Sequence, residues 1–329
     1  MNRRSMMLAM IGALTSAAVG SKARAQALDL SRPFTILVGF PAGGSVDISA
    51  RLVAEELRTS LGATVVVENV TGAGGKIAVE RAKNAPADGK TILVTPAATM
   101  TLYPLIYNKL SYDPVKDFIP VAQVCTLDYM LVISPKVVTG KVNTIADLAA
   151  WYLANPTNRV YGHGAAGSPM HFVGAMYGKH AKLDLTHVPY RGATLMIQDL
   201  LGGQIGVAVT TIADSLPHLK SGALKAIAVT GSKRSEFLPD VPTFIEQGAD
   251  IVAEDWFGAF VRSGTPKPIV DQLNSVIAAG VAKPAVRSRL SNLAFGSRAM
   301  PQPEFAKVFS AEIEKWTPVV QATGFKIEE

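Results

Sequence analysis

Two glycine-rich turns contain the residues of this chain whose types and spacing could do chemistry. The first follows the apolar segment 34–40 and places Gly43 and Gly44 directly before an amphipathic segment that begins near Ser45. The first N–H groups of a helix have no partner inside it, and the helix dipole makes that end electropositive. Glycine lacks the Cβ atom that would keep a ligand away from those donors. The turn is therefore predicted to bind a carboxylate or phosphate, with an ordinary strand-to-helix turn as the alternative.

The second turn, residues 162–168, has the spacing Gly-x-Gly-x-x-Gly between an expected strand and an expected helix. This spacing also occurs in dinucleotide-binding folds, which need an acidic residue at the end of the next strand. That strand instead ends in Pro189-Tyr190-Arg191, and Asp184 stands at its start. The glycines are better explained by an anion-binding nest at a helix N-terminus, and no cofactor is predicted.

Catalytic and metal-binding patterns are weak. Ser45 and Ser168 sit on sharp turns, but neither lies in a Gly-x-Ser-x-Gly elbow, and His171 follows Ser168 too closely to serve as its base. The five histidines do not have zinc-binding spacing, and Cys125 is the sole cysteine. The sequence therefore predicts no catalytic residue and no metal site, and a secreted hydrolase that uses Ser168 remains an alternative.

The N-terminus has the features of an export signal. Arg3 and Arg4 precede an apolar run, and Ala23-Arg-Ala25 is a small-x-small cleavage site. Cleavage near Ala25 predicts a periplasmic protein exported by the Sec or the twin-arginine route. Residues 1–25 carry four basic residues and no acid, so the formal charge falls from +6 to +2. This nearly balanced charge argues against nucleic acid as a partner.

The mature length predicts two domains, and short β-branched runs that alternate with amphipathic stretches predict α/β layers. The expected strands are 35–40, 64–68, 91–95, 159–162, 185–188, 205–209 and 225–230, with a long apolar run at 118–133. The expected helices are 48–61, 77–83, 168–180, 194–201, 269–281, 284–293 and 303–323.

Short signatures along the chain resemble those of a known family. They are Phe40-Pro-Ala-Gly-Gly-Ser-Val-Asp47, Val67-Glu-Asn-Val-Thr-Gly-Ala-Gly-Gly75, Leu110-Ser-Tyr-Asp-Pro-Val-Lys-Asp-Phe-Ile-Pro-Val121, His187-Val-Pro-Tyr-Arg-Gly192, Asp199-Leu-Leu-Gly-Gly-Gln-Ile205, Leu238-Pro-Asp-Val-Pro-Thr243 and Gly264-Thr-Pro-Lys-Pro268. With these, nearly the whole mature chain resembles the extracytoplasmic solute receptors of tripartite tricarboxylate transporters, the Bug receptors.

The resemblance implies a two-lobed α/β periplasmic binding protein of the Venus-flytrap, type II-like kind, each lobe a mainly parallel sheet flanked by helices. The lobes are expected at 26–125 with 250–329 and at 126–249. The family implies no enzymatic activity. It implies that a small organic carboxylate is held between the lobes and delivered to membrane subunits of a tripartite transporter. The chain is expected to be a monomer. A receptor that reports ligand to a membrane sensor remains an alternative.

The predicted ligand-binding residues lie mostly on the turns that follow strands. They are Phe40, Ala42, Gly43, Gly44, Asp47, Ala98, His163, Gly164, Ala166, Gly167, Ser168, His171, Tyr190, Arg191, Thr211 and Asp214. Asp47 is expected either to cap its own helix or to orient water at the ligand.

Two departures from the family pattern bear on specificity. His163 replaces a serine, and Gly206 stands where the family usually has an acid. These changes suit a dianion with a bulky or aromatic body, gripped by Arg191. If His163 contacts the ligand, binding is expected to tighten as the pH falls from 8 to 6.

Overall fold

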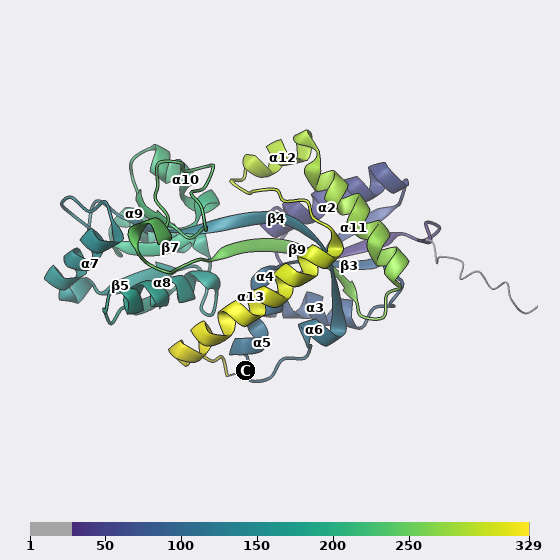
Figure 1. Ribbon diagram of the computed structural model, residues 1–329, viewed down its shortest axis with the longest axis horizontal. Coiled ribbons are helices and arrows are strands. Elements are labelled where there is room, and N and C mark those ends of the chain that lie inside the picture. The colour runs from purple at the N-terminus through teal and green to yellow at the C-terminus, as the bar shows by residue number, and fades with distance from the viewer. Residues whose placement is uncertain (1–27, 329) are drawn as a thin grey trace, which may run out of the picture.

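A computed structural model describes residues 28–328 of the chain, so the predicted signal peptide at 1–25 lies outside the described residues. Within 28–328, nine strands form one mixed sheet in the order β2-β1-β3-β9-β4-β7-β5-β6, and β8 also pairs with β4 (Figure 1). The strands are β1 (Phe34–Val38), β2 (Val65–Asn69), β3 (Thr91–Pro96), β4 (Phe118–Ile133), β5 (Val160–His163), β6 (Thr186–Pro189), β7 (Val207–Thr211), β8 (Lys225–Val229) and β9 (Glu254–Arg262).

Helices flank the sheet at both ends, and the predicted α/β alternation is confirmed. The helices are α2 (Ser45–Leu61), α3 (Lys76–Lys83), α4 (Ala97–Thr101), α5 (Tyr103–Ile106), α6 (Pro114–Asp117), α7 (Ile145–Ala154), α8 (Pro169–His180), α9 (Ala193–Gly202), α10 (Ile212–Lys220), α11 (Lys267–Ala282), α12 (Pro284–Ser291) and α13 (Gln302–Thr323). Short 3-10 turns occupy Ala73–Gly75, Pro156–Asn158 and Ile245–Gln247. In the described part of the chain, no helix is both long and apolar enough to cross a membrane.

The long strand β4 connects the two ends of the molecule. Its residues 118–128 pair antiparallel with β9, and its residues 129–133 pair antiparallel with β7. In Figure 1, β4 and β9 run between the group of elements around β3 and the group around β7. Its whole length was predicted as an apolar run, whereas β9 was not assigned as a strand although residues 255–261 are buried.

The strand directions bring two sets of strand ends toward each other. Strands β1, β2 and β3 are parallel, as are β5, β6 and β7. Pro96, at the end of β3, is in register with Cys125 of β4 through the intervening strand β9. Thr211, at the end of β7, pairs directly with Tyr129 of β4. Since β3 and β7 run in opposite directions on the two sides of the β4–β9 pair, their carboxyl ends point toward each other, offset along β4 by four residues, roughly 13 Å of strand. Ligands of open α/β sheets bind outside such ends.

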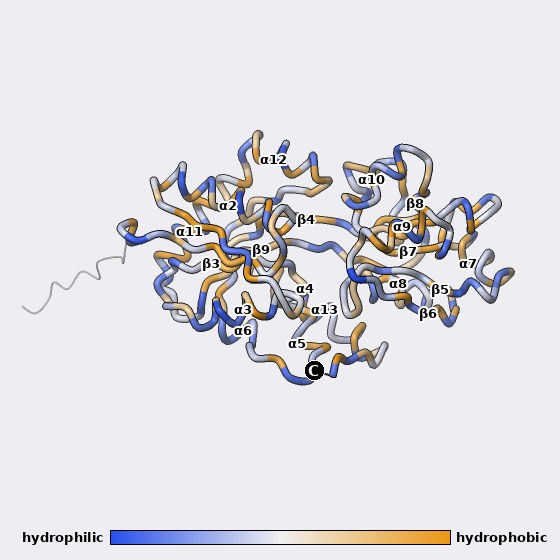
Figure 2. Tube along the Cα trace, turned by 180° about the vertical axis from the view of Figure 1, so that it is seen from behind, coloured by the Kyte–Doolittle hydropathy of each residue, from blue (hydrophilic) through white to orange (hydrophobic). Residues whose placement is uncertain are grey.

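The apolar side chains are concentrated along the strands, as the hydropathy colouring of Figure 2 shows for β4 and β7. One buried cluster includes residues of β1, β4 and β7 and extends to Trp316 on α13. Helix α13 runs obliquely across the molecule (Figure 1) and contacts β4, α8 and α5. The two ends of the sheet therefore share a core and are tied by the strand pair β4–β9 and by α13.

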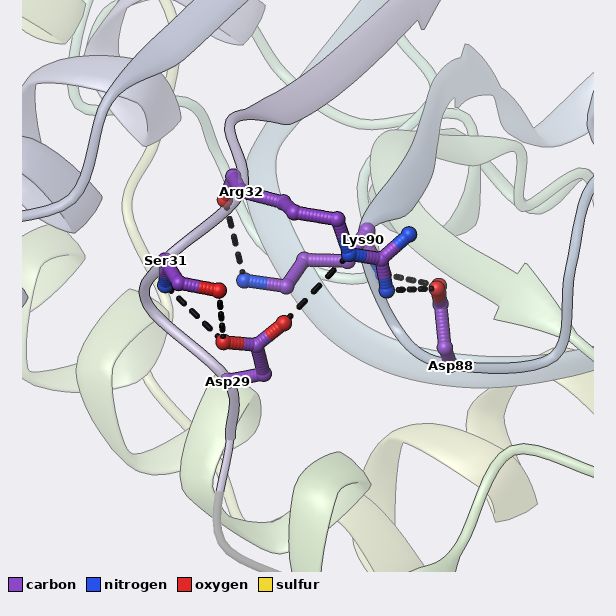
Figure 3. A network of polar contacts seen from close by, with 5 residues as sticks. All are labelled: Asp29, Ser31, Arg32, Asp88 and Lys90. Atoms are coloured by element: carbon purple, nitrogen blue, oxygen red, sulfur yellow. Dashed lines mark hydrogen bonds and ion pairs between the residues drawn. The ribbon is translucent and has the colours of Figure 1, made fainter.

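A polar network fixes the first described residues to the loop before β3 (Figure 3). Arg32 donates to Asp88 at 2.8 Å, and the ammonium of Lys90 donates to the backbone carbonyl of Arg32 at 3.1 Å. Asp29 accepts the hydroxyl of Ser31 at 2.6 Å. Lys90 also lies 4.2 Å from the ring centroid of Phe34. The segment before β1 is thus held in place before the chain enters the sheet.

The end of the β4–β9 pairing carries two facing carboxyl groups, and one of them, Asp128, raises the free energy of the folded state at neutral pH. Asp128 lies opposite Glu254 in the antiparallel register. Burial, and then the negative charge of Glu254, raise the pKa of Asp128 from its ordinary value of 3.8 to about 6. Because the folded-state pKa is raised, the group disfavours folding above pH 6, and the penalty disappears as the pH falls toward 3.8.

Replacing Asp128 by Asn is expected to raise the melting temperature at pH 8, because it removes a buried charge opposed to Glu254. The gain corresponds to at most about 3 kcal/mol and should be roughly halved at pH 5, where the folded wild-type carboxyl is mostly protonated. Thermal unfolding followed by circular dichroism at both pH values measures this. Asp184→Asn, at an exposed aspartate, is the matched control. A variant less stable than wild type at pH 8 would contradict the account.

Candidate functional site

The turn after β1 is closed by the side chain of Asp47. Gly43 has φ +79°, a left-handed conformation that favours glycine, and its N–H donates to Oδ2 of Asp47 at 2.9 Å. The same oxygen accepts Nε of Arg51 at 2.8 Å, and Oδ1 accepts Nδ2 of Asn69 at 2.9 Å. Asp47 is only 1% exposed. Its carboxylate is therefore fully engaged in shaping the turn.

These contacts decide the charge state of Asp47. Burial acts to raise the pKa of this carboxyl, but the hydrogen bonds from Arg51, Gly43 and Asn69 outweigh it and hold the pKa below its ordinary value. The negative charge is balanced by Arg51, so it opposes an anion at the turn less than a bare carboxylate would. The geometry favours the structural role expected for Asp47. It also shows that the N–H of Gly43, a predicted ligand donor, is already used.

Other residues predicted on this side lie at the ends of β1 and β3. Ala42 and Gly44 are exposed on the turn, and Ala98 is half-buried on the short helix α4 that follows β3. A Cβ atom added to Gly75 would lie only 3.2 Å from the ring of Phe40. The turn after β1 therefore packs on the loop after β2. Helix α2 begins at Gly44 without any side-chain cap, which leaves its first N–H groups open to a ligand.

The turn after β5 is more tightly packed than an open anion-binding nest. A Cβ atom on Gly164 would lie 3.3 Å from the backbone nitrogen of Ala193, and one on Gly167 would lie 2.6 Å from Cδ1 of Ile106. Gly167 has φ +72°, and Ser168 caps α8 by accepting the N–H of His171 at 3.4 Å. These glycines are therefore required by close approach and backbone conformation. Of this turn, only Ala165 and Ala166 are exposed.

Three histidines come together beside this turn. His163, at the end of β5, places Nε2 3.0 Å from Nδ1 of His187 on β6. His171, in the first turn of α8, has ring centroids 4.8 Å from His163 and 4.2 Å from His187. His163 is 0% exposed and His171 4%, while His187 is half-buried. The ring of Phe325, in the C-terminal segment, stands edge-on to His171 at 4.8 Å.

The environment keeps two of these histidines neutral. Burial, followed by the effect of His187, lowers the pKa of His163 from 6.5 to about 4. Burial, followed by the effects of His163 and His187, lowers the pKa of His171 to about 3. His163 therefore gains no charge between pH 8 and 6, and it does not support the expected tightening of ligand binding over that interval.

The ends of β6 and β7 hold the remaining predicted residues. The hydroxyl of Tyr190 donates to Asp199 at 2.9 Å, and burial together with that bond raises the pKa of Tyr190 to about 12. Thr211 caps α10 by accepting the N–H of Asp214 at 3.1 Å, and its hydroxyl donates to the Asp214 carboxylate at 2.7 Å. Both hydroxyls are thus engaged within their own end of the sheet.

Arg191 differs from these neighbours. It is exposed, and no residue within 28–328 forms a hydrogen bond or ion pair with its guanidinium. It stands directly before Gly192, where α9 begins without a side-chain cap. The start of α8 was predicted to meet the ligand, but Ser168 caps it. The start of α9 was not predicted as a donor site, and it has no side-chain cap. A free cation and free N–H groups therefore lie side by side at the end of β6.

The residues of the hydrolase alternative do not form a nucleophile–base pair. The hydroxyl of Ser168 donates to the backbone carbonyl of Ala165 at 2.7 Å. Nδ1 of His171 accepts the backbone N–H of Gly167 at 3.3 Å. Since a nucleophile needs its base within hydrogen-bond reach, this arrangement does not favour acyl transfer at Ser168.

His187 was not among the predicted ligand-binding residues, although the fold places it beside two of them, His163 and His171. His187 lies beside Tyr161 in the parallel β5–β6 register, two positions before Pro189, which is level with His163. Pairing the two strands on the printed sequence would have revealed this juxtaposition, because diagonal neighbours on one sheet face are within reach of long side chains. No pattern in the sequence predicts that Phe325, near the C-terminus, packs against His171.

A surface groove lies away from these residues. It has a volume of about 800 Å³ and is lined by the exposed side of α8, by residues 183–185 and 250–251 and by the end of α13. None of the predicted ligand-binding residues lines this groove. The strand ends, where the predicted residues gather, are therefore taken as the candidate site.

Comparison with known proteins identifies the family of the chain. Residues 49–325 match the family described as tripartite tricarboxylate transporter family receptor. The chain is 32% identical over 305 residues to the protein BugT of Bordetella pertussis, covering 91% of each. Among solved structures it resembles MatC from Rhodopseudomonas palustris with bound malate, at 30% identity and a TM-score of 0.74, covering 88% of this chain and 99% of that one.

A second structure from R. palustris, Rpa4515 with adipate, is 29% identical with a TM-score of 0.79, covering 91% of this chain and 99% of that one. These neighbours are two-domain solute-binding proteins, and they confirm the predicted fold class and the resemblance. The family and its relatives are binding proteins for transport. The chain therefore belongs to the receptor family of the tripartite tricarboxylate transporters.

Proposed function

We propose that this receptor captures a small dicarboxylate between the facing strand ends and delivers it to the membrane subunits of a tripartite transporter. The observation that carries the proposal is the exposed, unpaired Arg191 beside the uncapped start of α9. A guanidinium and backbone N–H groups bind a carboxylate through charge-assisted hydrogen bonds. The relatives with bound malate and adipate support a dicarboxylate as the ligand class.

The second carboxylate of such a ligand would meet the uncapped start of α2, across the gap between the ends of β3 and β7. The offset of roughly 13 Å along β4 between those strand ends leaves room for a ligand and bridging waters. Helix dipoles make both helix starts favourable for negative charge. The ligand site thus uses donors from both ends of the sheet.

We assign 26–125 and 250–329 to one lobe and 126–249 to the other, with closure by bending of β4 and β9. The pairing of β4 with β9 up to Asp128 and with β7 from Tyr129 supports this division. Closure around the anion would exclude water and strengthen the charged contacts. We further propose a monomer in the periplasm, released by cleavage near Ala25.

Arg191→Gln is expected to weaken malate or adipate binding by about 30-fold or more, the effect of losing a desolvated charge pair. The melting temperature should stay unchanged, because the guanidinium has no partner within 28–328. Isothermal titration calorimetry with both dicarboxylates measures the affinity. Arg287→Gln, at an exposed arginine on α12, is the matched control and should bind as wild type. Equal affinity of wild type and Arg191→Gln would refute the assignment of Arg191.

His163 and His171 are expected to remain neutral from pH 8 to pH 5, because their pKa values lie near 4 and 3. An NMR titration of the histidine ring protons, assigned with single histidine variants, tests this. The two resonances should not shift over that interval, and ligand affinity should gain nothing from His163. A ring resonance of His163 that titrates above pH 5 would show that the site is wetter than its burial indicates.

A further inference from the structure

We propose that His163, His171 and His187 form a binding site for a late first-row divalent metal ion, for which Zn²⁺ is the probe. One ring nitrogen from each residue contributes to a set whose members all lie within 4.8 Å of one another. The proposal rests on the geometry of the three histidines and does not depend on the carboxylate capture proposed above. Sequence spacing alone did not predict it, because the three residues come from three different elements.

The donor chemistry selects the kind of metal. Three imidazole nitrogens without a thiolate or carboxylate suit Zn²⁺, Cu²⁺ and Ni²⁺, whereas Mg²⁺ and Ca²⁺ require oxygen ligands. Three histidines bind zinc in known catalytic sites and leave a fourth position for water or another ligand. Imidazole binds a metal in its neutral form. The burial of His163 and His171 keeps both in that form.

The protein scaffold holds the three rings near one another. His163 ends β5, His187 lies on the neighbouring parallel strand β6, and His171 is in the first turn of α8, which packs on both strands. Phe172 and Phe325 pack against the ring of His171, with centroids at 5.0 and 4.8 Å. This apolar wall excludes water on one side, and the half-buried His187 provides the route by which an ion enters.

Metal binding requires a small rearrangement. Tetrahedral zinc with nitrogen ligands at 2.0–2.1 Å has nitrogen atoms about 3.3 Å apart, so the widest separation of 4.8 Å must shrink by rotation of the rings. The hydrogen bond between His163 and His187 must also break. Its proton moves to the other nitrogen of the donor ring, so both rings stay neutral and no net proton is released.

Two features of the surroundings bear on this rearrangement. Nδ1 of His163 is buried and makes only a weak contact with the Ala165 backbone, so it is free to carry the shifted proton. A metal-bound histidine normally donates its second N–H to a backbone carbonyl or similar acceptor. The bond from Gly167 to His171 is long at 3.3 Å and holds that ring weakly.

The test uses the mature chain without a histidine tag, stripped of metal with a chelator and titrated with ZnCl₂ by calorimetry. We expect one Zn²⁺ per chain. Single replacement of His163, His171 or His187 by Ala should weaken binding by about tenfold or more, since even outer partners of a zinc site have effects of that size. His180→Ala and His218→Ala, at the two histidines outside the cluster, are the matched controls and should bind as wild type.

Loss of folding in the buried variants is checked by circular dichroism, and His187→Ala is the decisive variant because His187 is half-buried. Co²⁺ added to the wild type gives a second readout that needs no variant: intense visible absorption indicates a tetrahedral site. Failure of the wild type to bind Zn²⁺ in large excess, a folded His187→Ala with wild-type affinity, or only the weak spectrum of hydrated Co²⁺ would each overturn the proposal.

Discussion

The antiparallel pairing of β4 with β9 is the constraint on which the rest of the structure depends. Because β4 continues past β9 into pairing with β7, one strand sets the relative position of both groups of helices. Its direction turns the carboxyl ends of β3 and β7 toward each other. Every predicted binding turn is placed by that arrangement, since each follows a strand that runs parallel to β3 or β7. The same two strands, β4 and β9, connect the two groups of helices.

Capping decides which helix starts remain open to an anion. Ser168 and Thr211 use their hydroxyls to satisfy the first turns of α8 and α10, while α2 and α9 begin at Gly44 and Gly192 without side-chain caps. An uncapped start has N–H groups that need a partner, and at a functional site that partner is a ligand. The donors for a carboxylate are therefore expected at α2 and α9 rather than at the Gly-x-Gly-x-x-Gly turn.

Much of the fold could be predicted from the sequence, because β-branched runs and helical periodicity are local signals. The expected strand at 118–133 coincides with β4, and the expected helix at 303–323 nearly coincides with α13. Strand β9 was not predicted, because its near-continuous burial gives no alternation of apolar and polar residues. The site was harder. Gly43 and Gly164 were predicted to face the ligand. In the fold, Gly43 donates to Asp47 and Gly164 lies close to the backbone of Ala193, and no local sequence pattern indicates these contacts.

The histidine cluster shows how a long-range contact changes the chemistry of a side chain. In the sequence, His163 is a titratable residue next to a turn, and a pH-dependent contact with the ligand is a reasonable expectation. In the fold, the register of β5 and β6 places His163 beside His187 in a buried position. His171 of α8 stacks on the ring of His163. Burial removes the charge that His163 would need to attract an anion, and the same burial leaves a neutral nitrogen of the kind that binds a metal. At His163 the fold thus favours coordination chemistry over charge at this end of the sheet.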